Sequence, residues 1–149
     1  MKVLISCDYS EAGKQVLHEA QKFLTAFPGA EIHIFSVIDI SVISAAGMYN
    51  NGELLKSLEL DGVELGKKAE HIFGDIKVHF STELGYPIET ILKKAKSISA
   101  DLLVLGTHGR TGLGRILIGS VAENILRHTS CNTLVVPVKH LKNGENTTG

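Results

Sequence analysis

A glycine-rich stretch carries the residue types best suited to chemistry in this chain. It reads LGTHGRTGLGRILIGSV, from Leu105 to Val121. A short apolar run precedes it and apolar residues at helical spacing follow it, so it is expected to join the end of a strand to the start of a helix. Glycine lets a backbone turn sharply and bring its N–H groups close to an anion, and the first turn of a helix adds unpaired N–H groups. The stretch therefore predicts a phosphate-binding loop; the alternative is that its glycines only shape a long connection.

Two polar residues stand beside predicted elements where a ligand could reach them. Ser120 opens the helix after the glycine-rich stretch, and its hydroxyl can cap that helix or donate to a phosphate. Asp8 follows the apolar run KVLISC, and taken by itself its simplest role is to cap the next helix.

The chain has two cysteines, Cys7 and Cys131, with no other Cys or His at metal-ligand spacing. Both are therefore expected to be free thiols, and no metal site is predicted.

The apolar pattern predicts five strands that alternate with four helices. Strands are expected over 2–7, 31–38, 77–82, 101–105 and 132–139. Helices are expected within 16–27, 58–72, 88–98 and 121–126, where apolar residues recur at helical spacing. Gly62 and Gly66 lower the helical propensity of the second helix. Residues 39–51 show no regular pattern, so no element is predicted there.

This alternation predicts an α/β domain whose sheet is largely parallel and covered by helices on both faces. In open sheets of this kind a ligand binds beyond the carboxyl ends of the strands, where the strand order reverses. The first and fourth strands are the expected pair, because Asp8 follows the first strand and Gly106 follows the fourth.

Composition narrows the class of protein. The chain has 149 residues, 44% hydrophobic and 21% charged, which is typical of one globular domain. A formal net charge of -1 argues against a nucleic-acid binder or a protein of acidic membrane surfaces. No apolar run approaches the roughly 20 residues that a membrane helix needs, so a cytoplasmic protein is expected. We expect a single domain over 1–139 and a flexible polar tail over 140–149.

The segment GTHGRTGLGRILIGS resembles the GxxG, nine residues, G(S/T) pattern of the ATP-binding branch of the universal stress protein family. The resemblance extends to KVLISCDYSE at the start, to VIDI, and to ADLLVLG before the segment. It continues through SVAENILRHTSCNTLVVPV and so covers nearly everything up to Val138. No Walker-type Gly-Lys-Ser/Thr occurs, and the glycine order does not fit a dinucleotide fingerprint.

The resemblance implies a three-layer α/β/α fold of the adenine nucleotide alpha hydrolase-like type, with about four helices and strand order 3-2-1-4-5. ATP would lie across the ends of the first and fourth strands, with Asp8 near the nucleoside and the main chain of Val37 at the adenine edge. Leu105 and Gly106 would border the ribose. The implied ATP-binding residues are Ser6, Cys7, Asp8, Val37, Leu105, Gly106, His108, Gly109, Gly119, Ser120 and Val121.

Each role has a plainer alternative or a departure from the family. Val37 is also a natural sheet-core residue, and His108 is more often a structural or solvated loop histidine. Asn132 stands where many relatives carry proline, and Tyr9 stands where small residues are common, so its ring either narrows the pocket mouth or packs outward. The stretch 39–52 carries no motif and is expected to act as a lid or a partner surface.

The function implied is an ATP-binding regulatory or stress-response protein that acts through binding and dimerisation, with an unidentified protein partner. Mg²⁺ is expected with ATP, because few basic residues stand near the loop. A homodimer is expected through the fifth strand, whose valines would otherwise leave a sheet edge open. The alternative is a slow ATPase or a nucleotidyl or phosphoryl transfer enzyme, for which Asp8, Asp39 and His108 are the plausible groups. No paired carboxylates are apparent, so no catalytic or metal residue is assigned.

Overall fold

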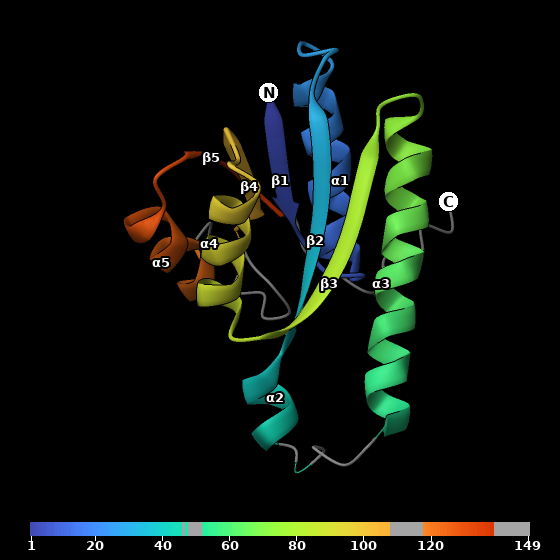
Figure 1. Ribbon diagram of the computed structural model, residues 1–149, viewed down its shortest axis with the longest axis vertical. Coiled ribbons are helices and arrows are strands. Elements are labelled where there is room, and N and C mark those ends of the chain that lie inside the picture. The colour runs from blue at the N-terminus through green and yellow to red at the C-terminus, as the bar shows by residue number, and fades with distance from the viewer. Residues whose placement is uncertain (46, 48–51, 108–117, 139–149) are drawn as a thin grey trace, which may run out of the picture.

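The computed structural model describes residues 1–45, 47, 52–107 and 118–138 (Figure 1). Within these residues the chain forms five strands and five helices. In chain order they are β1 (Lys2–Ser6), α1 (Glu11–Leu24), β2 (Glu31–Asp39), α2 (Ile40–Ala45), α3 (Gly52–Phe73), β3 (Val78–Gly85), α4 (Pro87–Ser97), β4 (Leu102–Gly106), α5 (Ser120–His128) and β5 (Asn132–Val136).

The five strands form one parallel sheet in the order β3-β2-β1-β4-β5. Helices α1 and α3 pack on one face and α4 and α5 on the other, which gives three layers (Figure 1). The predicted fold class and strand order are therefore confirmed. From β1 the chain moves outward to β2 on one side, and from β4 it moves outward to β5 on the other side. The strand order therefore reverses between β1 and β4, as the sequence predicted.

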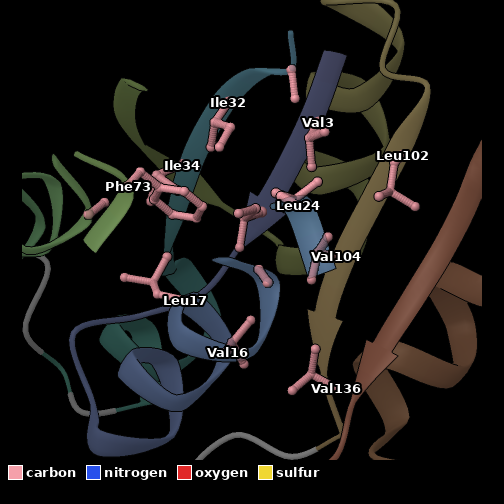
Figure 2. Close-up of a cluster of buried hydrophobic side chains, with 14 of the residues drawn as sticks. Val3, Val16, Leu17, Leu24, Ile32, Ile34, Phe73, Leu102, Val104 and Val136 are labelled. Carbon is pink, nitrogen blue, oxygen red and sulfur yellow. The ribbon is translucent and has the colours of Figure 1, made fainter. Parts of the chain in front are cut away.

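Alternate residues of each strand face opposite layers and fill two apolar clusters. Val3 and Ile5 pack with Leu17 of α1 and Leu65 of α3, whereas Leu4 packs with residues of α4 and α5. Figure 2 shows the first cluster, where side chains from four strands converge with those of α1 and α3. Because both faces are buried, the central strands are continuous apolar runs, and this made them easy to recognise in the sequence.

Local signals set where α1 and α4 begin. Ser10 is the N-cap of α1, and its Oγ accepts a hydrogen bond from the Gly13 amide at 3.1 Å. Gly13 allows a close approach, because a Cβ there would lie 1.9 Å from the Asp8 carbonyl oxygen. Pro87 opens α4, where its fixed φ suits the first turn. The tight turn from β1 into α1 holds Asp8 at the carboxyl end of the sheet.

The structure adds α2 to the four predicted helices, within the stretch expected to be irregular. Asp39 Oδ1 accepts hydrogen bonds from the Ser41 amide at 2.9 Å and from the Ser41 hydroxyl at 2.6 Å. This Asx turn ends β2 and starts a six-residue helix that buries Ile43. A side-chain turn rather than apolar periodicity defines α2, and so periodicity missed it. At the other end of the chain, β5 stops at Val136, short of its predicted end, because its partner β4 stops opposite at Gly106.

Two organisational expectations stay predictions. The boundary between a domain at 1–139 and a tail at 140–149 falls outside the described residues, and so do 46 and 48–51 of the expected lid. Among the described helices, none combines the length and the apolar character needed to cross a bilayer.

Candidate functional site

A cleft of about 580 Å³ opens at the carboxyl ends of β1, β2 and β4. It is also lined by the first turns of α1 and α5, by α2, and by parts of α3 and α4. The carboxyl ends of the strands lie at the lower end of the sheet in Figure 1, on the side of α2. The cleft thus lies at the reversal of strand order, where open α/β sheets bind their ligands.

The cleft brings together nine of the eleven residues proposed from the sequence. They are Ser6, Cys7, Asp8, Val37, Leu105, Gly106, Gly119, Ser120 and Val121. The remaining two, His108 and Gly109, lie outside the described residues. Six of them come from the carboxyl ends of three neighbouring strands, and the other three come from the start of α5.

Asp8 leaves the end of β1 and is fixed by the turn into α1. Its Oδ1 accepts a hydrogen bond from the Ser10 amide at 3.1 Å and a short one from the Ser10 hydroxyl. The N-cap of α1 is therefore Ser10, and Asp8 holds that cap in place instead of serving as one. Within the described part of the chain, Asp8 Oδ2 has no hydrogen-bond partner, so the second carboxylate oxygen is available to accept from a ligand hydroxyl.

Val37 presents backbone groups to the cleft because β1 ends before β2 does. The β1–β2 ladder stops at Ser6 and Phe35, where the Cys7 amide donates to the Phe35 carbonyl at 3.1 Å. In a parallel ladder every second residue faces the same neighbour, so the N–H and C=O of Val37 point to the same side as those of Phe35. No described strand lies on that side at Val37, although β3 continues along the other edge to Gly85. The main chain of Val37 is therefore open for hydrogen bonds to a planar heterocycle.

The two ends of the glycine-rich stretch are tied together beside the cleft. The Gly119 amide donates to the Thr107 carbonyl at 2.6 Å. The Thr107 amide donates to the Val136 carbonyl at 2.9 Å, and the Thr107 hydroxyl accepts from the Val138 amide at 3.1 Å. Thr107 is 4% exposed and anchors both ends to β5. These bonds return the chain to the cleft after the segment 108–117, which lies outside the described residues.

Helix α5 begins at the cleft with its first amides uncapped. Gly119 is its N-cap, and among the described residues no side chain caps the helix. Since the first helical bond runs from the Glu123 amide to the Gly119 carbonyl, the amides of Ser120, Val121 and Ala122 have no helical partner. The N-cap position is therefore Gly119 and not Ser120, so the Ser120 hydroxyl is not used as a cap. Free amides and the helix dipole make this turn suitable for an anion.

The Cys7 thiol packs against the first apolar cluster behind the cleft. Burial raises the pKa of this thiol far above its ordinary value, and the neighbouring Asp8 carboxylate raises it further. The thiol therefore stays neutral and is a poor nucleophile. Cys7 therefore contributes packing and backbone to the cleft.

Charge in the described lining is entirely negative. Asp8, Asp39 and Asp61 line the cleft, and no lysine, arginine or histidine does so among the described residues. An anionic ligand would need a cation between it and these carboxylates, or basic residues from 108–117.

Tyr9 also lines the cleft, and its ring lies under Lys14 with Nζ 4.7 Å from the ring centroid. Tyr9 is 37% exposed, so it forms part of the rim.

Asp61 and Thr107 are among the lining residues that sequence reasoning missed. Asp61 lies in the middle of α3, and only the crossing of α3 behind β2 and β3 brings it to the cleft. Gly62 marks that crossing, because a Cβ there would lie 2.5 Å from Thr82 Oγ1. Thr107 follows Gly106 directly, and its unusual burial for a polar residue is visible only in three dimensions. Neither position carries a local sequence signal.

Comparison with known proteins gives a consistent result. The universal stress protein family model matches residues 1–137. The curated universal stress protein MJ0531 of Methanocaldococcus jannaschii is 34% identical over 142 residues, covering 91% of this chain and 81% of that protein. The solved structure of the hypothetical protein MJ0577, from the same organism, superposes with a TM-score of 0.79 at 29% identity, covering 94% and 97% of the two chains. A universal stress protein solved in complex with cAMP shares the fold, with a TM-score of 0.65 at 22% identity over 92% and 96% of the chains. This chain belongs to the universal stress protein family.

Proposed function

We propose that this protein binds ATP with Mg²⁺ in the cleft and acts as a nucleotide-dependent regulator in a stress response. The observation that carries the proposal is the pairing of two sets of open backbone groups around one cleft. The main chain of Val37 stands at one end of the cleft, and the uncapped amides at the start of α5 stand at another. A flat base and an anionic tail on one ligand would satisfy both.

Each part of ATP has a counterpart in the cleft. The adenine edge would pair with the N–H and C=O of Val37, and a ribose hydroxyl would donate to Asp8 Oδ2. Phosphate oxygens would accept from the amides of Ser120 and Val121, with His108 and Gly109 completing the loop. Mg²⁺ would offset the repulsion between the triphosphate and the three aspartates, because the described lining offers no cation. The cAMP complex of a protein with this fold supports an adenine nucleotide here.

Calorimetric titration with MgATP tests the proposal. We expect saturable binding at one site per chain, with adenosine and MgGTP binding more weakly. Gly119→Val should abolish binding, since its side chain would fill the approach to the α5 amides. The backbone at Gly119, with φ -64° and ψ 157°, suits any L residue, so the fold should survive. Gly29→Val is the matched control, because a Cβ at Gly29 meets nothing within 4 Å. Normal MgATP binding by Gly119→Val would overturn this placement of the phosphates.

Slow ATP hydrolysis is the second candidate function. Asp8, Asp39 and Asp61 around the cleft could position Mg²⁺ or orient a water molecule. Phosphate release measured beside equilibrium binding separates the two functions, since a regulator retains ATP and an enzyme turns it over repeatedly. Asp8→Asn, Asp39→Asn and Asp61→Asn would then identify the group that hydrolysis requires.

We also propose that the protein dimerises through β5. This strand is an edge of the sheet, and three of its five residues are only partly buried in the chain by itself. Pairing two copies along this edge would satisfy its open backbone groups. Light scattering at micromolar concentration should give twice the chain mass.

We also propose a cytoplasmic location. A reducing compartment keeps Cys7 and Cys131 as free thiols, as they are in the structure.

A further inference from the structure

A cluster of two histidines and one glutamate lies at the opposite end of the sheet from the cleft. His33 of β2 and His79 of β3 are direct partners in the parallel ladder, and Glu31 precedes His33 by two residues. Glu31 and His33 share a face of the sheet, because residues two apart on a strand point the same way. His79 shares that face as the direct partner of His33, and nearer the middle of the sheet α4 and α5 cover this face. These are the amino ends of β2 and β3, at the top of the sheet in Figure 1.

The candidate ligand atoms are already close together. His33 Nε2 lies 2.9 Å and His79 Nε2 lies 3.6 Å from the same oxygen, Glu31 Oε1. The three residues can each offer an atom within 4.8 Å of the others. Nitrogen and oxygen ligands at about 2.0 Å from a tetrahedral Zn²⁺ stand about 3.3 Å apart. The two distances to Glu31 Oε1, 2.9 Å and 3.6 Å, lie on either side of that spacing.

The cluster is poorly satisfied without a cation. His33 occupies the hydrogen bond to Glu31, and His79 Nε2 is buried with no hydrogen-bond partner. The two imidazole rings stack with centroids 4.7 Å apart, so the two side chains lie directly beside each other. A neutral imidazole nitrogen that is buried and unpaired has a lone pair suited to a metal. A divalent ion would bind the lone pairs of His79 and His33 and the Glu31 carboxylate at the same time.

The carboxylate is ready to serve as a ligand. Its Oε1 is the atom nearest to both imidazoles, and a carboxylate oxygen is a ligand that Zn²⁺ binds in proteins. Glu31 and His79 are each 40% exposed and the His33 side chain 15%, so an ion can enter from solvent and keep a water ligand. Two histidines and a carboxylate with an open position is a ligand set that Zn²⁺ and related divalent transition metals prefer.

We propose that Glu31, His33 and His79 form a site for a divalent transition-metal ion of the Zn²⁺ type. The site is separate from the cleft, because His33 and Val37 are four residues apart on one strand, which is about 13 Å. A metal there joins the edge strand β3 to β2 through side chains of both strands. It therefore stabilises an edge of the sheet that the nucleotide does not touch.

Zinc titration of the untagged protein tests the proposal, with a chromophoric chelator as competitor. We expect one strongly bound Zn²⁺ per chain, and at least about a tenfold loss of affinity in His33→Gln, His79→Gln and Glu31→Gln. His18→Gln is the matched control, since His18 is an exposed histidine on α1 and should leave the affinity unchanged. MgATP binding by His79→Gln should stay normal, and Gly119→Val should still bind Zn²⁺, so failure of this site and failure of the proposed nucleotide site are distinguishable.

A second measurement on the wild-type protein tests the same site without relying on a variant that could fail to fold. In long-range ¹H–¹⁵N spectra of the wild-type protein, Zn²⁺ should shift the ring nitrogens of His33 and His79 and leave those of His18 in place. Co²⁺ in place of Zn²⁺ should give the visible absorption of a four- or five-coordinate ion. Unchanged affinity in the folded double variant His33→Gln/His79→Gln would overturn the proposal. So would the absence of these shifts at saturating Zn²⁺.

Discussion

The two ends of the sheet differ in the groups that they offer to a ligand. The carboxyl end offers mainly backbone, through the open edge of Val37 and the uncapped amides of α5, and its described side-chain charges are all negative. The amino end of β2 and β3 offers side chains, with two imidazoles and a carboxylate at adjacent register positions. Backbone sites need glycine and fixed spacing, which leave a pattern in the sequence. A side-chain site across two strands needs only register, which leaves none.

The largest expected difference between variants at the two ends is in how much MgATP raises their free energy of unfolding. At about 100 times its dissociation constant, MgATP should raise the free energy of unfolding by roughly 2.7 kcal/mol. Urea denaturation with and without MgATP measures this difference. Gly119→Val should lose the whole effect, whereas His33→Gln/His79→Gln should keep it, because its changes lie at the other end of the sheet. Loss of the effect in the histidine variant would show that the ends are coupled.

Gly13→Ala should destabilise the carboxyl end by about 2 kcal/mol, since its Cβ would clash with the Asp8 carbonyl and move the turn. Gly29→Ala, where a Cβ meets nothing within 4 Å, should change stability by less than about 0.5 kcal/mol. Urea denaturation of both variants measures the difference. Calorimetry should also show weaker MgATP binding in Gly13→Ala, because Asp8 moves with the turn. Equal stability of the two variants would contradict the tight turn.

Cys7 should make stability fall at alkaline pH. Its pKa is raised in the folded state, so the folded thiol keeps its proton while the unfolded one ionises. The stabilisation is therefore complete below the unfolded thiol pKa of about 8.5 and is lost as pH rises above it, by up to about 1.4 kcal/mol per pH unit. Denaturation of the wild type and of Cys7→Ala between about pH 8 and pH 10 measures the difference. Parallel pH profiles for the two proteins would refute the buried thiol.

Ser10→Ala gives the smallest expected change. It removes the side-chain cap of α1 and a partner of Asp8 Oδ1, and should cost about 1 kcal/mol. Ser97→Ala is the matched control, because its hydroxyl is exposed and donates to the Lys94 carbonyl of its own helix. Thermal denaturation should separate the two variants. A cost for Ser97→Ala as large as that for Ser10→Ala would remove the special role of the cap.

Most of the fold was accessible from the sequence, and the exceptions have identifiable causes. Buried parallel strands are short apolar runs, and α1, α4 and α5 have clear apolar stripes, so these elements were predicted. α3 starts at Gly52, ahead of its predicted start, because its first turns bury little and show no stripe. α2 was missed because Asp39 and Ser41 start it by local hydrogen bonds. The residues proposed to bind ATP were inferred from family resemblance, and the cleft gathers those of them that the structure describes.

The sequence by itself determined the layers, the strand order through its family resemblance, and the glycine-rich stretch. Each of these depends on residues close together in the chain. Only the tertiary structure decided that β1 stops short of Val37, that Asp61 reaches the cleft and that His33 stands opposite His79. These relations depend on where strands end and on how they align with partners distant in sequence. A strand's hydrophobic pattern decides which of its residues face the core, but its exact partners and its end depend on neighbouring strands that are distant in sequence.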